Sequence, residues 1–234
     1  MRRSTLCWLV ILGLVGCARQ QPAPPAGGET AVPTARVPEE EVQPAAPRVE
    51  EAAASEEVPA AKPVKVLMII APDNFRDEEL REPRRILQQH GATVVIASTA
   101  RREYTGMKGM KVTPDLTLKQ VNVADYGAIV FIGGVGAKTY WNHPTALQIA
   151  KDTVRLKKVL GAICIAPVIL ANAGVLKGKR ATVWSSEAGR LRAKGAIYTG
   201  ASVEVDGRII TGNGPEAAVK FGHALARTLG LEKE

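Results

Sequence analysis

The residue whose type and position best suit covalent chemistry is Cys164. A strand-like apolar run, 159–163, comes directly before it, and Pro167, which suits the first turn of a helix, follows three residues later. A strand, a tight turn carrying the reactive residue and a helix form the arrangement called a nucleophile elbow. The helix N-terminus would direct N–H groups and a positive dipole at the sulfur, which predicts a lowered cysteine pKa. The alternative interpretation of Cys164 is a small side chain buried in the core.

Alternating strands and helices are expected to position this cysteine. Apolar, β-rich runs predict strands at 64–71, 93–97, 128–132, 159–163 and 181–184, and amphipathic stretches predict helices at 77–90, 144–157, 167–172, 187–194 and 215–229. Pro83 suits the first helix because we expect it near the first turn. A hairpin is expected within 103–118, and two short strands around 206–207. This alternation predicts an α/β fold with an open, mostly parallel sheet, whose sites form at the carboxyl ends of strands.

Four separated segments resemble the motifs of one family. They are FRDEEL at 75–80, IGG at 132–134, GAICIAPVILANAGVLKGKRAT at 161–182 and VDGRIITGNGPEAA at 205–218. In this order they are similar to the ThiJ/PfpI superfamily, also called the DJ-one/PfpI family, over about residues 64–230. The resemblance implies a flavodoxin-like three-layer sandwich of the class I glutamine amidotransferase-like type, usually dimeric or larger. It also implies a reactive elbow cysteine, which falls on Cys164.

The resemblance implies roles for three further residues. The family's acidic partner of the cysteine falls on Glu79, and its oxyanion-binding amides fall on Gly134 and Ile165. A carboxyl group that keeps its proton beside a sulfur can donate a hydrogen bond to the thiolate. Two amides could hold the oxyanion that forms when sulfur attacks a carbonyl, or the oxygens of an oxidised sulfur. Taken alone, Glu79 also fits a solvated acid in the first turn of a helix.

Both histidines of the family pattern are missing. Protease-like members have histidine directly after the cysteine, where this chain has Ile165, and other members have one at the position of Trp184. We expect His143 or Ser185 as a polar neighbour of the site, although a turn explains His143 and an N-cap explains Ser185 equally well. Without a neighbouring base, a cysteine protease mechanism has no evident proton shuttle.

The first residues of the chain indicate export and a lipid anchor. A positive segment at 1–3 and an apolar stretch at 6–16 have the anatomy of a bacterial secretory signal, and the stretch is too short to span a bilayer. Its end, Leu14-Val15-Gly16-Cys17, resembles the lipobox of lipoproteins, which implies a signal peptide at 1–16 and acylation of Cys17. The alternative is an ordinary signal that ends in cysteine. Ala18 after the anchor favours the outer membrane, facing the periplasm, in a Gram-negative source.

Composition and charge divide the remaining chain. Residues 18–62 are rich in Pro, Ala and Glu and lack aromatic residues, so 17–62 is expected to be a lipidated cysteine and a disordered tether, followed by one domain at 63–234. Residues 65–234 carry 25 basic against 15 acidic side chains. Because no basic stripe with interleaved aromatics occurs, we expect anionic envelope surfaces rather than nucleic acid as partners. Three scattered cysteines do not suit a four-ligand zinc site, and we expect no metal and no cofactor.

These observations leave three hypotheses for function. The first is a cysteine-dependent enzyme acting on small reactive carbonyls or glycated adducts, resembling the glyoxalase and deglycase activities attributed to the family. The second is a redox-responsive or protective protein in which an oxidant converts Cys164 to a sulfinate. The third is a non-catalytic binding module. In each case we expect a homodimer attached to the membrane through Cys17.

Overall fold

The structure, a computed structural model, describes residues 63–233. The signal peptide, the lipidated Cys17 and the tether predicted for residues 1–62 lie outside the described residues. Within the described part of the chain, no helix is both long enough and apolar enough to cross a membrane.

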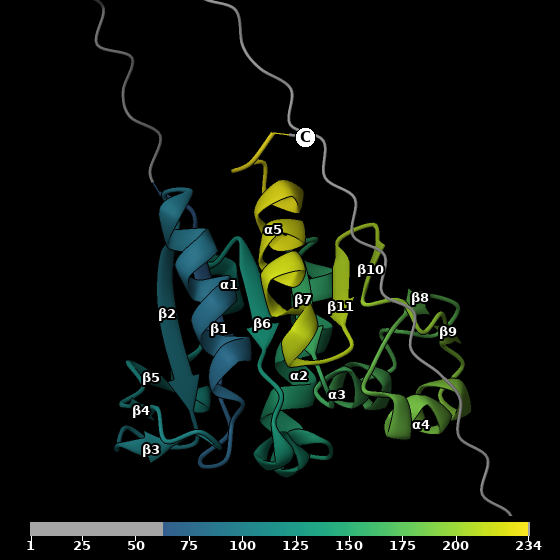
Figure 1. The fold of residues 1–234 in the computed structure, drawn as a ribbon, viewed down its shortest axis with the longest axis horizontal. Helices are drawn as coiled ribbons and strands as arrows, with labels where there is room; N and C mark the ends of the chain where they lie inside the picture. Colours follow the sequence, from purple (N-terminus) through teal and green to yellow (C-terminus); the bar gives the residue numbers. More distant parts are fainter. Residues whose placement is uncertain (1–62, 234) are drawn as a thin grey trace, which may run out of the picture. The chain divides into compact units, whose positions relative to one another are not determined.

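A seven-stranded sheet forms the middle layer, in the order β10-β11-β7-β6-β1-β2-β5 (Figure 1). Neighbouring strands are parallel, except that β10 is antiparallel to β11. The strands of this sheet are β1 (Lys65–Ile69), β2 (Thr93–Ser98), β5 (Leu116–Thr117), β6 (Ala128–Phe131), β7 (Val159–Ile163), β10 (Val203–Asp206) and β11 (Ile209–Gly212). The predicted α/β fold with a mostly parallel sheet is therefore confirmed.

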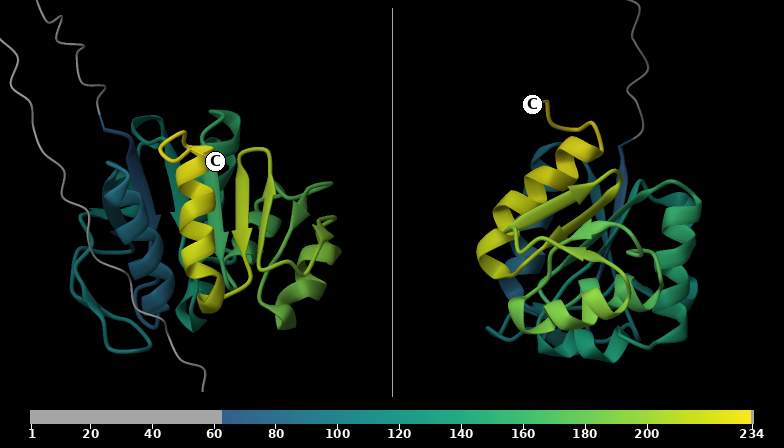
Figure 2. Two further views of the ribbon diagram at one scale, coloured as in Figure 1. Left: turned by 45° about the horizontal axis from the view of Figure 1, so that its top comes forward. Right: turned by 90° about the vertical axis from the view of Figure 1, so that its right-hand side faces the viewer.

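Helices cover both faces of this sheet. α1 (Asp77–Gln89) and α5 (Ala218–Thr228) lie side by side on one face, and α2 (Pro144–Arg155) and α3 (Pro167–Asn172) cover the other (Figure 1 and Figure 2). The remaining helices are α4 (Ala188–Ala193), which packs against α3, and the short 3-10 helices η1 (Leu118–Gln120), η2 (Val123–Asp125), η3 (Val135–Tyr140), η4 (Ser185–Glu187) and η5 (Pro215–Ala217). β6 and β7 are buried on both faces, which explains their continuous apolar sequences.

The segment expected as a strand at 181–184 does not join the central sheet. Only Arg180–Ala181 is a strand, β8, which pairs with β9 (Ile197–Tyr198) in a separate two-stranded sheet, and β11 takes the place beside β7. Side chains of the β10–β11 hairpin accept the backbone donors here. Asp206 accepts from Arg180 N, and Thr211 Oγ1 accepts from Thr182 N, both at 2.9 Å. The segment therefore runs beside the sheet instead of extending it.

The hairpin predicted within 103–118 is confirmed. β3 (Tyr104–Thr105) pairs antiparallel with β4 (Lys111–Val112). The buried carboxylate of Asp77, at the start of α1, accepts hydrogen bonds from Lys108 N at 2.8 Å and Met110 N at 2.7 Å. The turn between the two strands is thereby tied to the N-terminus of α1.

Pro83 lies in the middle of α1, and the expectation that it would lie near the first turn is wrong. A proline there removes one backbone donor from the helix. At this level α1 and α5 approach closely, since a Cβ added at Gly222 of α5 would lie 3.0 Å from Pro83 Cα and 2.8 Å from Ile86 Cδ1. The glycine thus sets a short separation between the two helices.

Candidate active site

Cys164 follows β7 directly, with its backbone in the left-handed region at a φ of 63°. This conformation is uncommon for residues other than glycine, and it places the cysteine on a sharp turn before α3. Two hydrogen bonds hold the turn: Cys164 N donates to Gly212 O at 2.9 Å, and Trp184 N donates to Cys164 O at 2.8 Å. The order of strand, turn and helix expected around Cys164 is therefore present.

Two backbone amides face the sulfur. The N–H groups of Gly134 and Ile165 hydrogen-bond Cys164, and both bonds act to lower the pKa of its thiol. Gly134 has a φ of 90°, and a Cβ added there would lie 2.5 Å from Arg76 N and Asn74 O. Only glycine can present its amide at this point. Both amides assigned by the family resemblance thus lie at the sulfur.

Glu79 reaches the same place from the first turn of α1. Its side chain is fully buried, Gly133 N donates to Oε2 at 3.1 Å, and Oε1 has no partner of ordinary hydrogen-bond geometry. Burial, the largest cause, raises the pKa of Glu79 to about 8, although Cys164 and the Gly133 amide act to lower it. At neutral pH this carboxyl group is mostly protonated and can donate a hydrogen bond. The interpretation of Glu79 as a solvated acid is therefore wrong.

Gly133 is the point at which the cysteine, the acid and the backbone meet. A Cβ added there would lie 2.5 Å from both Cys164 Cβ and Glu79 Oε2. Real Cβ atoms essentially never approach other atoms so closely, so the two side chains can flank this position only if it is glycine. The Gly133-Gly134 pair therefore does two separate tasks: the first residue makes room, and the second presents a donor.

The pKa of Cys164 depends on the protonation state of Glu79. Burial first, and the charge of ionised Glu79 second, raise the pKa of the thiol to about 12, and the amides of Gly134 and Ile165 offset only part of this. The lowered pKa expected from the elbow is therefore wrong, and burial of the thiol is the main reason. Protonation of Glu79 removes the repulsion and supplies a donor to the thiolate. The thiolate is therefore less disfavoured with the proton on the carboxyl group, while burial still acts against it.

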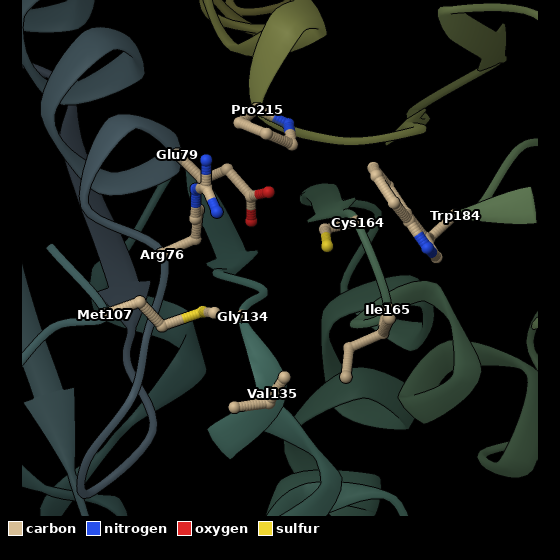
Figure 3. A pocket seen from close by; sticks show the side chains of 9 residues that line it. All are labelled: Arg76, Glu79, Met107, Gly134, Val135, Cys164, Ile165, Trp184 and Pro215. Atoms are coloured by element: carbon tan, nitrogen blue, oxygen red, sulfur yellow. The ribbon is translucent and has the colours of Figure 1, made fainter.

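Cys164 and Glu79 open into a pocket of about 200 Å³ (Figure 3). The lining residues are Arg76, Glu79, Met107, Gly134, Val135, Cys164, Ile165, Trp184 and Pro215. Figure 3 shows the carboxyl group of Glu79 and the sulfur of Cys164 directed toward the middle of this space. Most of the remaining lining is apolar, and Arg76 is its one basic side chain. The pocket suits a small molecule that presents an electrophilic carbon to the sulfur.

Comparison with protein families identifies the chain. The model of the DJ-1/PfpI family matches residues 64–228. This chain belongs to the DJ-1/PfpI family. The family expected from the four sequence motifs is confirmed, and the match covers nearly all of the described residues.

Similar DJ-1/PfpI proteins come from archaea and bacteria. An uncharacterized protein of Methanocaldococcus jannaschii is 43% identical over 176 residues, which cover 74% of this chain and 86% of the relative. A protein named as a deglycase in Pyrococcus abyssi is 33% identical over 149 residues, 64% of this chain and 90% of the relative. The crystal structure of a ThiJ/PfpI domain protein from Brachyspira murdochii gives a TM-score of 0.71 at 29% identity, covering 74% of this chain and 100% of that one.

Two predicted polar neighbours do not line this DJ-1/PfpI pocket. His143 is the N-cap of α2, where its Nδ1 accepts from Ala146 N at 3.4 Å, and its ring packs edge-on against Tyr140. Ser185 lines a second cavity, which shares Trp184 and Pro215 with the sulfur pocket. Within the described part of the chain, the pocket has no histidine. The turn and cap interpretation of His143 is therefore the correct one.

Other lining residues were not predicted from the sequence. Arg76 belongs to the same FRDEEL motif as Glu79, and this proximity in sequence could have indicated that it lines the pocket. Met107 comes from the hairpin turn, where its backbone N donates to Phe75 O at 2.9 Å. Trp184, the position at which the family resemblance led us to look for a histidine, also lines the pocket.

Proposed function

We propose that this DJ-1/PfpI protein is a cysteine-dependent enzyme that acts on small reactive carbonyl compounds or on the adducts they form with proteins. The observation that carries the proposal is the meeting of Cys164, buried Glu79 and the amides of Gly134 and Ile165 at one pocket. The relative named as a deglycase supports carbonyl adducts as the substrate class.

Addition of the thiol to a carbonyl uses each of these groups. The thiol proton passes to the ionised fraction of Glu79, and Cys164 Sγ attacks the carbonyl carbon, so that an S–C bond forms and the C=O π electrons move onto oxygen. The amides of Gly134 and Ile165 stabilise the resulting oxyanion. Glu79 then returns the proton to this oxygen. The product is a hemithioacetal beside a carboxylate, which can act as a base in the next step.

The pocket restricts the substrate. A volume of about 200 Å³ accommodates a small dicarbonyl or the modified end of a side chain. Met107, Val135 and Trp184 make the walls apolar, and the one basic lining side chain, Arg76, is paired with Glu78 at 2.8 Å. The protease-like pattern of the family uses a histidine beside the cysteine, and no histidine lines the described pocket. Carbonyl chemistry is therefore favoured over proteolysis.

Methylglyoxal turnover by the purified full chain tests this proposal. We expect measurable turnover in the wild type and only the background rate in Cys164→Ser, because a serine hydroxyl is much less acidic than a thiol and Glu79 cannot deprotonate it effectively. Ser185→Ala is the matched control, since Ser185 lies in the neighbouring cavity, and it should keep wild-type turnover. Equal turnover in Cys164→Ser and the wild type would overturn the proposal.

The same groups support a second candidate function, peroxide sensing. Cys164 would be oxidised to sulfenic and then sulfinic acid, each step consuming one peroxide and releasing one water. The amides of Gly134 and Ile165 could bind the new oxygens, and no base is needed. Peptide mass spectrometry after mild peroxide should find selective oxidation of Cys164, and its absence contradicts this function.

We also propose that the domain is held at the cell envelope as a lipoprotein, at the outer membrane facing the periplasm, and that it forms a homodimer. The lipobox ending in Cys17 supports the anchor. The excess of basic side chains in residues 65–234 suits a position close to anionic lipid.

A further inference from the structure

We propose that His90, His223 and Glu232 form a binding site for a divalent transition-metal ion such as Zn²⁺. One ligand atom from each residue lies within 4.8 Å of the other two, and all three residues are partly buried. His90 directly precedes the turn into β2, at the amino ends of the strands, whereas Cys164 follows the carboxyl end of β7. The proposed site is therefore at the opposite end of the sheet from the candidate active site.

Two segments distant in the sequence, the end of α1 and the region of α5, bring these ligands together. His90 is the C-cap of α1, His223 lies within α5, and Glu232 follows α5. The two imidazole rings meet edge-on, with centroids 6.3 Å apart. Gly222, beside His223, permits the close approach of α1 and α5. Leu231 packs against the core and its N–H is bonded to the last turn of α5, which holds Glu232 over the histidines.

The carboxylate of Glu232 is oriented for metal binding. Its Oε2 lies 2.9 Å from His223 Nδ1 and 4.0 Å from His90 Nε2, so this oxygen faces both imidazoles. Its Oε1 lies 3.7 Å from Arg227 Nη1 and 3.0 Å from His223 Nδ1. An ion held between Oε2 and the two nitrogens would replace the hydrogen bond between His223 and Glu232, while Arg227 keeps its contact with Oε1. The arginine therefore orients the carboxylate without occupying the ligand oxygen.

The ligand set selects the class of ion. Two imidazoles and one carboxylate suit Zn²⁺ and similar ions, whereas Ca²⁺ and Mg²⁺ prefer sites made of oxygen alone. A tetrahedral ion about 2.1 Å from each ligand separates the ligand atoms by about 3.4 Å. The two measured separations from Oε2, 2.9 and 4.0 Å, lie on either side of that value. Small side-chain rotations would close the site and leave a fourth position for water.

Isothermal titration of the full chain with Zn²⁺ tests the proposal. We expect saturable binding in the wild type that His90→Ala, His223→Ala and Glu232→Gln each abolish, with little heat from Mg²⁺. His143→Asn is the matched control, because it removes the third histidine but keeps an N-cap acceptor, and it should bind as the wild type does. A rise in Tm with Zn²⁺, lost in the same three variants, provides a second readout.

Cysteine thiolates also bind Zn²⁺, and Co²⁺ separates the two kinds of site. A thiolate ligand gives a sulfur-to-metal charge-transfer band, whereas the proposed site gives none. Glu232→Gln alters a residue beyond the last helix and keeps the proposal testable if His223→Ala does not fold. Failure of the wild type to bind Zn²⁺, or unchanged binding in His90→Ala and Glu232→Gln, would overturn the proposal.

Discussion

At the scale of residues, Glu79 and Cys164 titrate as a pair. The first proton leaves with a pKa of about 8, and burial together with repulsion from the charge left behind holds the second until a pKa of about 12. We expect the rate of Cys164 alkylation by iodoacetamide to rise up to about pH 8 and then level off, because the single negative charge is shared with Glu79. In Glu79→Gln the rate should continue to rise. Peptide mass spectrometry of the full chain measures both profiles, and superimposable curves contradict the coupling.

Glu79 also makes the stability of the fold depend on pH. Its pKa is about 8 in the folded chain against an ordinary value of 4.5, so the folded state binds the proton more tightly than the unfolded state. This stabilisation is fully present below pH 4.5 and is lost as the pH rises through 8, at a cost of about 5 kcal/mol at most. Glu79→Gln cannot ionise. We therefore expect its free energy of unfolding, measured with urea, to vary less between pH 5 and 8 than that of the wild type, and parallel curves argue against the raised pKa.

At the scale of elements, the Asp77 carboxylate joins the β3–β4 turn to α1. Asp77→Ala leaves the N–H groups of Lys108 and Met110 without their acceptor, which costs at most about 1–3 kcal/mol for each part-buried donor and frees Met107 from the pocket wall. We expect faster hydrogen exchange at amides 106–110 and lower turnover.

Asp77→Asn is the matched control for this prediction. It keeps a side-chain oxygen that can accept one of the two bonds, and so we expect an intermediate exchange rate. Wild-type exchange at these amides in Asp77→Ala shows that another interaction holds the turn.

Local sequence patterns predicted most elements of the fold and little of the pocket. β7 has the predicted bounds and α3 does as well, because continuous apolar runs and a proline at the first helical turn are local signals. The prediction of a strand at 181–184 failed because side chains of β10 and β11 accept hydrogen bonds from the backbone N–H groups of this segment. Met107 lines the pocket because its turn is bonded to Asp77, which lies about thirty positions earlier in the sequence. Such long-range contacts leave no local pattern.

The key residues of the site were found through the family motifs rather than through periodicity. Cys164, Glu79, Gly134 and Ile165 come from separate segments, and the parallel sheet gathers them because the carboxyl ends of neighbouring strands meet at one edge. The raised pKa of Glu79 could not be predicted from sequence, since it results from complete burial by all these elements together.

At the scale of the whole molecule, Cys17 and Cys164 are expected to have separate tasks. If Cys17 carries the lipid anchor, the wild type expressed in a Gram-negative host should sediment with membranes and dissolve in detergent. Cys17→Ser should lose this processing and anchoring, whereas Cys164→Ser, the matched control, should remain with the membranes. Fractionation followed by immunoblotting measures this, and identical distributions of the wild type and Cys17→Ser contradict the lipoprotein proposal.

At position 164 the left-handed backbone favours glycine for stability, whereas the proposed chemistry requires cysteine. A side chain at this φ of 63° costs about 1 kcal/mol relative to glycine, so glycine would relax the turn between β7 and α3. Selection for stable folding alone would therefore drive position 164 toward glycine, and only selection for the sulfur itself opposes that change. In a library of variants at this position, selection for stability should enrich glycine, whereas selection for carbonyl turnover should enrich cysteine.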